Sequence, residues 1–184
     1  MTLAQALLIF TTHLMSTTCQ KDPVTKQCMP YDHQVMEDTV EAVARVTSDF
    51  SEAETLVKIA RWESGGFRKD VANCKVKGDH GAALGLFQVH PYLDGEGALL
   101  CSSDYSQQAA VALQRVRDSV NICKMHGYKG SDLLTVYTCG HCCAHNPHAW
   151  LRWGDGKEVS SLVYTEITQS IQRKENCDGQ EAER

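Results

Sequence analysis

The chain has 184 residues, of which 42% are hydrophobic and 22% charged, and this length and composition are typical of one globular domain. They exclude wholesale disorder, collagen and coiled coil. The net charge of -5 lacks the basic excess of a nucleic-acid-binding protein, so we expect no nucleic acid partner. The sequence has no apolar run of the roughly 18 residues that a membrane-spanning helix needs, so we expect no membrane span.

The first residues of the chain leave two interpretations open. An amphipathic helix is predicted because four apolar residues recur on one helical face: Leu3, Leu7, Phe10 and Leu14. The stretch 3–10 is also apolar enough for the core of a secretion signal, although no Lys or Arg precedes it. Cys19 and Cys28 then bracket a polar turn, which is typical of a disulfide-closed loop. We therefore expect residues 1–30 to form an N-terminal helix or signal-like segment followed by this loop.

Helices beyond this segment are predicted from apolar periodicity and from end signals. They cover residues 35–47, 51–64, 104–124, 131–137 and 159–173. Ser51 and Glu54 have the spacing of a capping box at the start of the second helix, and Gly65 and Gly66 end it.

The remaining segments contain little regular structure. Residues 67–81 are polar and are predicted to form a loop. Residues 82–90 are short, apolar and interrupted by glycine, which predicts an irregular buried strand. A polar tail covers 179–184. The predicted fold class is therefore mainly α, with one short β segment.

Glu63 is the strongest candidate for a catalytic residue. It lies three positions after Ala60 and seven after Leu56, so it continues the apolar stripe of its helix. Burial on this face and the negative end of the helix dipole both favour the protonated carboxyl group. A carboxyl group that keeps its proton near neutral pH is suited to general acid catalysis.

Around Glu63 the sequence resembles goose-type lysozymes and lytic transglycosylases. The resemblance rests on Glu63-Ser64-Gly65-Gly66-Phe67, Gly78-Asp79-His80-Gly81 and Gly85-Leu86-Phe87-Gln88-Val89, followed by Val136-Tyr137-Thr138-Cys139-Gly140. It covers roughly residues 50–170, and Thr138 replaces an Asn that is usual in the family. It implies a two-lobed α+β lysozyme-like domain over residues 31–178, with a short irregular β segment and a central cleft. It also implies that Glu63 is the catalytic acid, with substrate contacts from Ser64, Gly85, Gln88 and Tyr137.

The family cleaves the β-1,4 bond between N-acetylmuramic acid and N-acetylglucosamine in peptidoglycan. An inverting hydrolase needs a second carboxylate to activate water. A lytic transglycosylase needs only the one Glu, because a hydroxyl of the sugar closes an anhydro ring. Asp79 matches a family Asp that helps to hold the water, whereas His90 replaces another Asp that is frequent there. The presence of a second carboxylate, Asp79, in addition to Glu63 favours a hydrolase, and a lytic transglycosylase stays the alternative.

Nine cysteines scattered along the chain favour disulfides and an oxidising compartment. We therefore expect an extracellular, periplasmic or virion-associated protein. Residues 139–148 are rich in Cys and His, and a disulfide-bonded loop is favoured there over a zinc site or a dithiol redox motif. Accordingly, no metal and no cofactor are expected.

Two functions of other classes stay open. One is a catalytically silent lysozyme-like module that binds glycan or builds a phage particle, and Thr138 and His90 favour it. The other is a metal or redox module at residues 139–148. The expected partners are peptidoglycan glycan strands and, for a phage-borne protein, other virion proteins.

Overall fold

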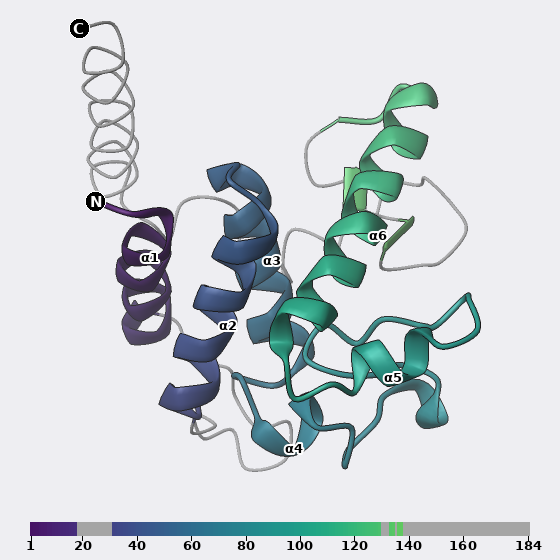
Figure 1. The fold of residues 1–184 in the computed structure, drawn as a ribbon. Coiled ribbons are helices and arrows are strands. Elements are labelled where there is room, and N and C mark those ends of the chain that lie inside the picture. Colours follow the sequence, from purple (N-terminus) through teal and green to yellow (C-terminus); the bar gives the residue numbers. More distant parts are fainter. Residues whose placement is uncertain (18–30, 130–132, 135, 138–184) are drawn as a thin grey trace, which may run out of the picture.

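The computed structural model describes residues 1–17, 31–129, 133–134 and 136–137 (Figure 1). These residues form mainly helices: α1 (Leu3–Thr17), α2 (His33–Val46), α3 (Phe50–Glu63), α4 (Lys69–Ala72), α5 (Glu96–Leu100) and α6 (Tyr105–Met125). A 3₁₀ turn, η1, covers Asp79–Gly81, and the described ranges contain isolated β-bridges but no sheet. The prediction of a mainly α fold is confirmed at this level. No helix within these ranges is both long and apolar enough to cross a bilayer.

The core lies where α2 packs against α1, α3 and α6. Figure 1 shows α2 and α3 between α1 and α6. Burying a large apolar side chain stabilises a protein by about 1.5–3 kcal/mol, so this core fixes the two helices, α3 and α6, that carry site residues. Its buried members from α2, α3 and α6 include Val40, Val43, Leu56, Val57, Ile59, Ala109, Leu113 and Val116.

The N-terminal helix packs by the face that the sequence predicts. Leu7, Phe10 and Leu14 are buried, and the Phe10 ring meets the Phe50 ring of α3 edge-on at a centroid distance of 6.4 Å. The helix therefore contributes apolar burial next to α3. The secretion-signal interpretation of this stretch stays a prediction.

The predicted start of α3 is wrong by two residues. Asp49, not Ser51, is the N-cap, and its carboxylate accepts a hydrogen bond from the Glu52 amide at 2.9 Å. Both residues are good caps, but capping at Asp49 places Glu52 in the first turn. There the Glu52 carboxylate also accepts a hydrogen bond from the Thr47 hydroxyl at 2.6 Å. This additional hydrogen bond favours the earlier start.

The segment between α3 and α6 differs most from the prediction. The expected loop over 67–81 contains α4 and η1, and α5 was not predicted. The expected strand over 82–90 is a pair of tight turns, closed by the bridges Gly78–Ala83 and Leu84–Val89. Gly85 and Gln88 have φ angles of +70° and +47°, which reverse the chain where a strand would continue.

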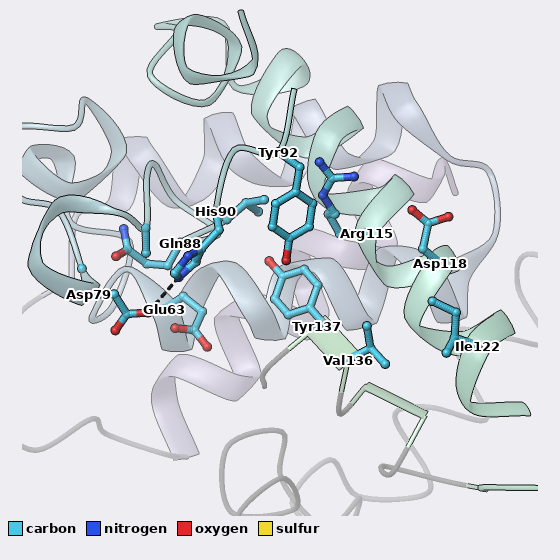
Figure 2. Close-up of a pocket in the computed structure, with 13 residues that line it drawn as sticks. Glu63, Asp79, Gln88, His90, Tyr92, Arg115, Asp118, Ile122, Val136 and Tyr137 are labelled. Carbon is cyan, nitrogen blue, oxygen red and sulfur yellow. Dashed lines mark hydrogen bonds and ion pairs between the residues drawn. The ribbon is translucent and has the colours of Figure 1, made fainter. Parts of the chain in front are cut away.

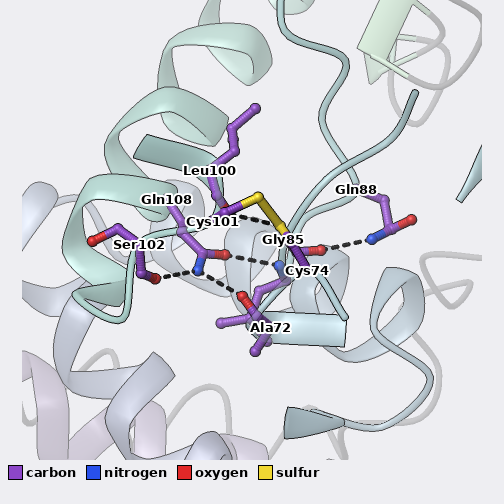
Figure 3. The surroundings of a disulfide bond; sticks show 9 residues. Ala72, Cys74, Gly85, Gln88, Leu100, Cys101, Ser102 and Gln108 are labelled. Carbon is purple, nitrogen blue, oxygen red and sulfur yellow. Dashed lines mark hydrogen bonds between the residues drawn. A yellow bond between two sulfur atoms is a disulfide. The ribbon is translucent and has the colours of Figure 1, made fainter. Parts of the chain in front are cut away.

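A buried amide joins this segment to α6, and a disulfide joins two positions within the segment (Figure 3). Gln108 of α6 is fully buried; its Nε2 donates to the carbonyls of Ala72 at 2.9 Å and Ser102 at 2.7 Å, and its Oε1 accepts from the Leu86 amide at 2.8 Å. Cys74 and Cys101 are joined by a disulfide, which confirms the expectation of paired cysteines for these two. The end of α4, the turn at Leu86 and the chain after α5 are thus fixed to α6.

Several predictions lie outside the described residues. These are the loop between Cys19 and Cys28, the helix over 159–173, the Cys- and His-rich stretch 139–148, and the polar tail.

Candidate active site

A pocket of about 700 Å³ opens beside the C-terminal end of α3. Its walls come from Glu63, from the segment 78–92, from α6 and from residues 136–137. Figure 2 shows Glu63, Asp79, Gln88 and His90 at one end, with Tyr92, Tyr137 and Arg115 further along. The sequence-predicted residues Glu63, Asp79, Gln88 and Tyr137 all line it, whereas Ser64 and Gly85 are not among its lining residues.

Glu63 is the last residue of α3 and is partly buried. The apolar residues that precede it on the same stripe, Leu56 and Ala60, are fully buried. The helix therefore packs as the sequence predicts and delivers the carboxyl group to the pocket at its C-terminal end.

Asp79 and His90 meet at the mouth of the pocket. The Nε2 atom of His90 lies 2.8 Å from Oδ2 of Asp79, and the side chains are 44% and 72% exposed respectively. The imidazole that replaces an expected Asp in the sequence is thus paired with the Asp that the sequence singled out. The pair is reachable from solvent and from the pocket.

Tyr137 forms part of the pocket wall. Its hydroxyl donates to the carbonyl of Phe87 at 2.7 Å, and its amide donates to Oγ of Ser119 at 3.1 Å. Burial, together with the negative charge of Glu63, raises the pKa of the Tyr137 phenol well above its usual value of 10. The phenol therefore stays neutral and acts as a hydrogen-bond donor that ties residues 136–137 to the turn at Phe87.

Gln88 has part of its amide committed to the fold. Its Nε2 donates to the Gly85 carbonyl at 2.8 Å. Its Oε1 lies against Gly78, so that any Cβ at position 78 would collide with it. Glycine is required at Gly85, where a Cβ would collide with the backbone carbonyl of Leu100, whereas a Cβ at Gly78 would have to displace the end of the Gln88 side chain.

Ser64 acts at the end of α3. It is 1% exposed, its hydroxyl donates to the Ala60 carbonyl at 2.6 Å, and it accepts from the Phe67 amide at 2.7 Å. Ser64 therefore sets the direction in which the chain leaves the helix after Glu63, and Gly85 allows the close approach of α5 and α6.

The backbone around the pocket adopts conformations that side chains disfavour. Among the residues that the structure describes, five other than glycine have φ between +46° and +62°: Phe67, Cys74, Asp79, His80 and Gln88. Asp79 and Gln88 among them line the pocket. Such conformations cost of order 1–3 kcal/mol each and cluster at functional sites, where the surrounding structure holds them. Here the hydrogen bond from Leu86 to Gln108 and the disulfide at Cys74 fix neighbouring parts of the same segment.

Tyr92 and Arg115 also line the pocket and were not predicted. Nη2 of Arg115 donates to both oxygens of Glu96 at 2.7 and 2.8 Å, and its guanidinium lies 4.5 Å from the centroid of the Tyr92 ring. Arg115 and Glu96 are 19 positions apart and belong to no motif. No local pattern could have identified this pair, since the fold alone joins them.

The described residues contain no group of three or more His, Cys, Asp or Glu side chains that could hold a metal ion. No family model matches the chain, and neither a curated protein nor a solved structure does.

Proposed function

We propose that the pocket cleaves the β-1,4 glycosidic bond between N-acetylmuramic acid and N-acetylglucosamine in peptidoglycan. The observation that supports this most is that Glu63, Asp79, Gln88 and Tyr137 line one pocket although they come from distant parts of the sequence. These residues carry the resemblance to goose-type lysozymes and lytic transglycosylases. The finer architecture that we propose is the two-lobed fold of that family, with this pocket as part of its cleft.

In the proposed reaction Glu63 acts as the general acid. Its proton passes to the bridging oxygen, the C1–O bond breaks, and the bonding electron pair leaves with the departing sugar. Positive charge then develops at C1. Water attacks C1 from the opposite face, and its proton passes to the pair formed by Asp79 and His90. One water molecule is consumed, and solvent returns both acid and base to their starting states.

The pair of Asp79 and His90 is the reason to favour hydrolysis. A water-activating base must be reachable by solvent, and both side chains are. In the transglycosylase alternative, a hydroxyl of the muramic acid residue attacks C1 in place of water and leaves an anhydro end. The disulfide between Cys74 and Cys101 supports a location in an oxidising compartment, where peptidoglycan is found.

The test is digestion of purified peptidoglycan by the parent protein, Glu63→Gln and Glu54→Gln. Gln keeps the volume of the carboxyl group but has no proton to give, so Glu63→Gln should lower the rate by at least about 10²-fold. Glu54 lies on the same helix and forms an ion pair with Lys58 at 2.6 Å, away from the pocket, so Glu54→Gln should retain activity.

Mass spectrometry of the released muropeptides then identifies the reaction. Reducing ends indicate a hydrolase and anhydro ends indicate a transglycosylase. Full activity of Glu63→Gln, or a parent protein that does not cleave peptidoglycan, would overturn the proposal.

A further inference from the structure

Tyr92 is an aromatic ring held in place at the pocket while most of it is left in solvent. It lines the pocket and is 63% exposed. We propose that Tyr92 is a stacking platform for an N-acetylhexosamine ring of the glycan, next to the bond that is cleaved. This inference rests on the proposed function and adds a binding site to it.

The loop that carries Tyr92 is fixed by one carboxylate. Glu96 accepts hydrogen bonds from the amides of Tyr92 at 2.7 Å and Leu93 at 3.2 Å, and it pairs with Arg115. The Glu96 side chain is only 11% exposed and that of Arg115 only 17%. The supporting residues are thus largely buried, and the ring that they support is not.

The guanidinium of Arg115 also fixes the plane of the ring. It lies 4.5 Å from the ring centroid, which is the geometry of a cation–π contact. Because Arg115 comes from α6, the ring is attached to the core of the fold rather than to its own loop alone. A ring that is ordered before binding loses little conformational entropy when a ligand stacks on it, which favours affinity.

The exposed ring matches the chemistry of a pyranose. One face of an N-acetylhexosamine presents C–H groups, while its hydroxyl and acetamido groups point outward. An aromatic ring offers apolar area to the C–H groups. The hydroxyl and acetamido groups can contact the polar side chains of the same pocket, among them Asp79, Gln88 and His90. In Figure 2 the Tyr92 hydroxyl points toward that of Tyr137, so the ring extends into the pocket and not away from it.

The neighbouring residue provides a matched control. Leu93 is 68% exposed on the same loop and does not line the pocket. Leu93→Ala therefore removes a similar amount of exposed apolar surface without touching the platform.

The experiment measures binding of the N-acetylglucosamine tetramer by calorimetry, in the Glu63→Gln background so that no cleavage interferes. Adding Tyr92→Ala should raise Kd about tenfold, since aromatic contacts contribute on this scale. Adding Tyr92→Trp should hold Kd within about threefold, and adding Leu93→Ala should leave Kd unchanged. In the active protein, Tyr92→Ala should raise KM for peptidoglycan and leave kcat nearly the same.

The outcomes separate this inference from the proposed function. Equal Kd values for Tyr92→Ala and its background would overturn the platform, while loss of cleavage in Glu63→Gln would still support the glycosidase. If Tyr92→Ala lowers the melting temperature, its weaker binding could come from lost stability, and Tyr92→Trp then tests the platform because it keeps an aromatic ring. Weak binding by Tyr92→Trp would also overturn the platform. A parent protein that neither cleaves peptidoglycan nor binds the tetramer would overturn both. Binding of a stem peptide instead, lost in Tyr92→Ala, would overturn the sugar platform alone.

Discussion

The segment between Gly78 and Tyr92 has an inner and an outer part that differ in almost every physical property. The inner part, Leu86 and Phe87, is fully buried and is fixed through Leu86 to Gln108 and through Phe87 to Tyr137. The outer part, formed by Asp79, His90 and Tyr92, is largely exposed and lines the pocket. We call these the floor and the rim.

The contrast indicates that the floor stabilises the fold and that the rim is available for chemistry. The floor uses its polar groups within the fold, so none of its hydrogen bonds depends on a ligand. The rim carries the groups that accept protons or stack in the proposed function, and Asp79 among them has a disfavoured φ angle of +46°. Substitutions in the floor should therefore change stability, and substitutions in the rim should change function. The predictions below test this division, in order of decreasing effect on the free energy of unfolding.

The largest effect is expected for Gln108→Ala. It removes three hydrogen bonds and leaves the Leu86 amide and the carbonyls of Ala72 and Ser102 without their partner. Unpaired buried polar groups cost about 1–3 kcal/mol each, so the free energy of unfolding should fall by about 3–5 kcal/mol. Urea denaturation measures it. Gln107 is an exposed neighbour on α6, and Gln107→Ala should change the free energy of unfolding by less than about 0.5 kcal/mol. Similar values for both variants would contradict the stabilising role of Gln108 beneath the floor.

Removal of the disulfide by Cys74→Ser with Cys101→Ser should come next. The two cysteines are 27 positions apart, and closing a loop of this length stabilises the folded state by about 3.5 kcal/mol in the chain-entropy model. The melting temperature of the double variant should fall by many degrees and should no longer respond to reductant through this pair. An unchanged melting temperature would show that Gln108 alone is sufficient to hold the segment.

Glu96 joins the loop that carries Tyr92 to Arg115 of α6, and the effect of its substitution on stability should depend on pH. Burial of this carboxylate opposes its ionisation, but the amides of Tyr92 and Leu93 and the charge of Arg115 outweigh burial and lower its pKa from 4.5. A carboxylate with a lowered pKa in the folded state stabilises the protein above its unfolded pKa, and this contribution is lost as the pH falls through the folded value. Glu96→Gln should therefore lower the free energy of unfolding by about 1.5 kcal/mol at pH 7.

The difference between parent and Glu96→Gln should shrink as the pH falls below about 4.5, the unfolded pKa. Thermal melts of both proteins between pH 7 and pH 3 check this. Glu37, which is exposed on α2, serves as the control position. A difference that grows toward low pH would contradict the sign of the Glu96 contribution.

Tyr137→Phe should have a smaller effect. It removes the hydroxyl that donates to the Phe87 carbonyl at 2.7 Å and keeps the ring. One hydrogen bond contributes about 1 kcal/mol, and the free energy of unfolding should fall by this amount. Because the phenol is neutral in the folded protein, the effect should be the same at pH 6 and pH 9. A pH-dependent difference would instead assign an ionisation to Tyr137.

Much of the helical framework could be predicted from the sequence, for a local reason. Helix α6 was expected over 104–124 and is found over Tyr105–Met125, because its apolar stripe repeats over many turns. The start of α3 was misplaced because Asp49 and Ser51 are both competent caps, and the choice depends on Thr47. The strand over 82–90 was wrong because an apolar run does not show that Gln88 adopts a positive φ, and Gln is not a residue that favours this conformation.

The site divides in the same way. The residues that line the pocket and carry the family resemblance could be named from the sequence: Glu63, Asp79, Gln88 and Tyr137. Gln108 could have been noticed as the polar member of the apolar stripe of α6, but its three partners come from other segments. Tyr92 gave no signal at all. Its placement at the pocket depends on Arg115 and Glu96, which only the tertiary fold brings together.

Substitution of Asp79 or His90, the pair on the rim, should have the smallest effect on stability and the clearest effect on the reaction. Asp79 and His90 form an exposed pair, and such pairs contribute about 0–1 kcal/mol. Asp79→Asn and His90→Asn should therefore leave the free energy of unfolding nearly unchanged. Each should nevertheless lower the rate of hydrolysis by about 10²-fold or more if the pair accepts the proton of the attacking water. Asp94→Asn, an exposed Asp of the nearby loop, is the control for both measurements.

The products are more informative than the rate. Loss of the base leaves Glu63 able to protonate the leaving oxygen, and the hydroxyl of the muramic acid residue can then replace water at C1. The fraction of anhydro muropeptides should consequently rise in Asp79→Asn and His90→Asn. If the parent already yields only anhydro ends and both variants match its rate, the pair has no part in water activation. The enzyme would then be a transglycosylase, and the rim would act in binding alone.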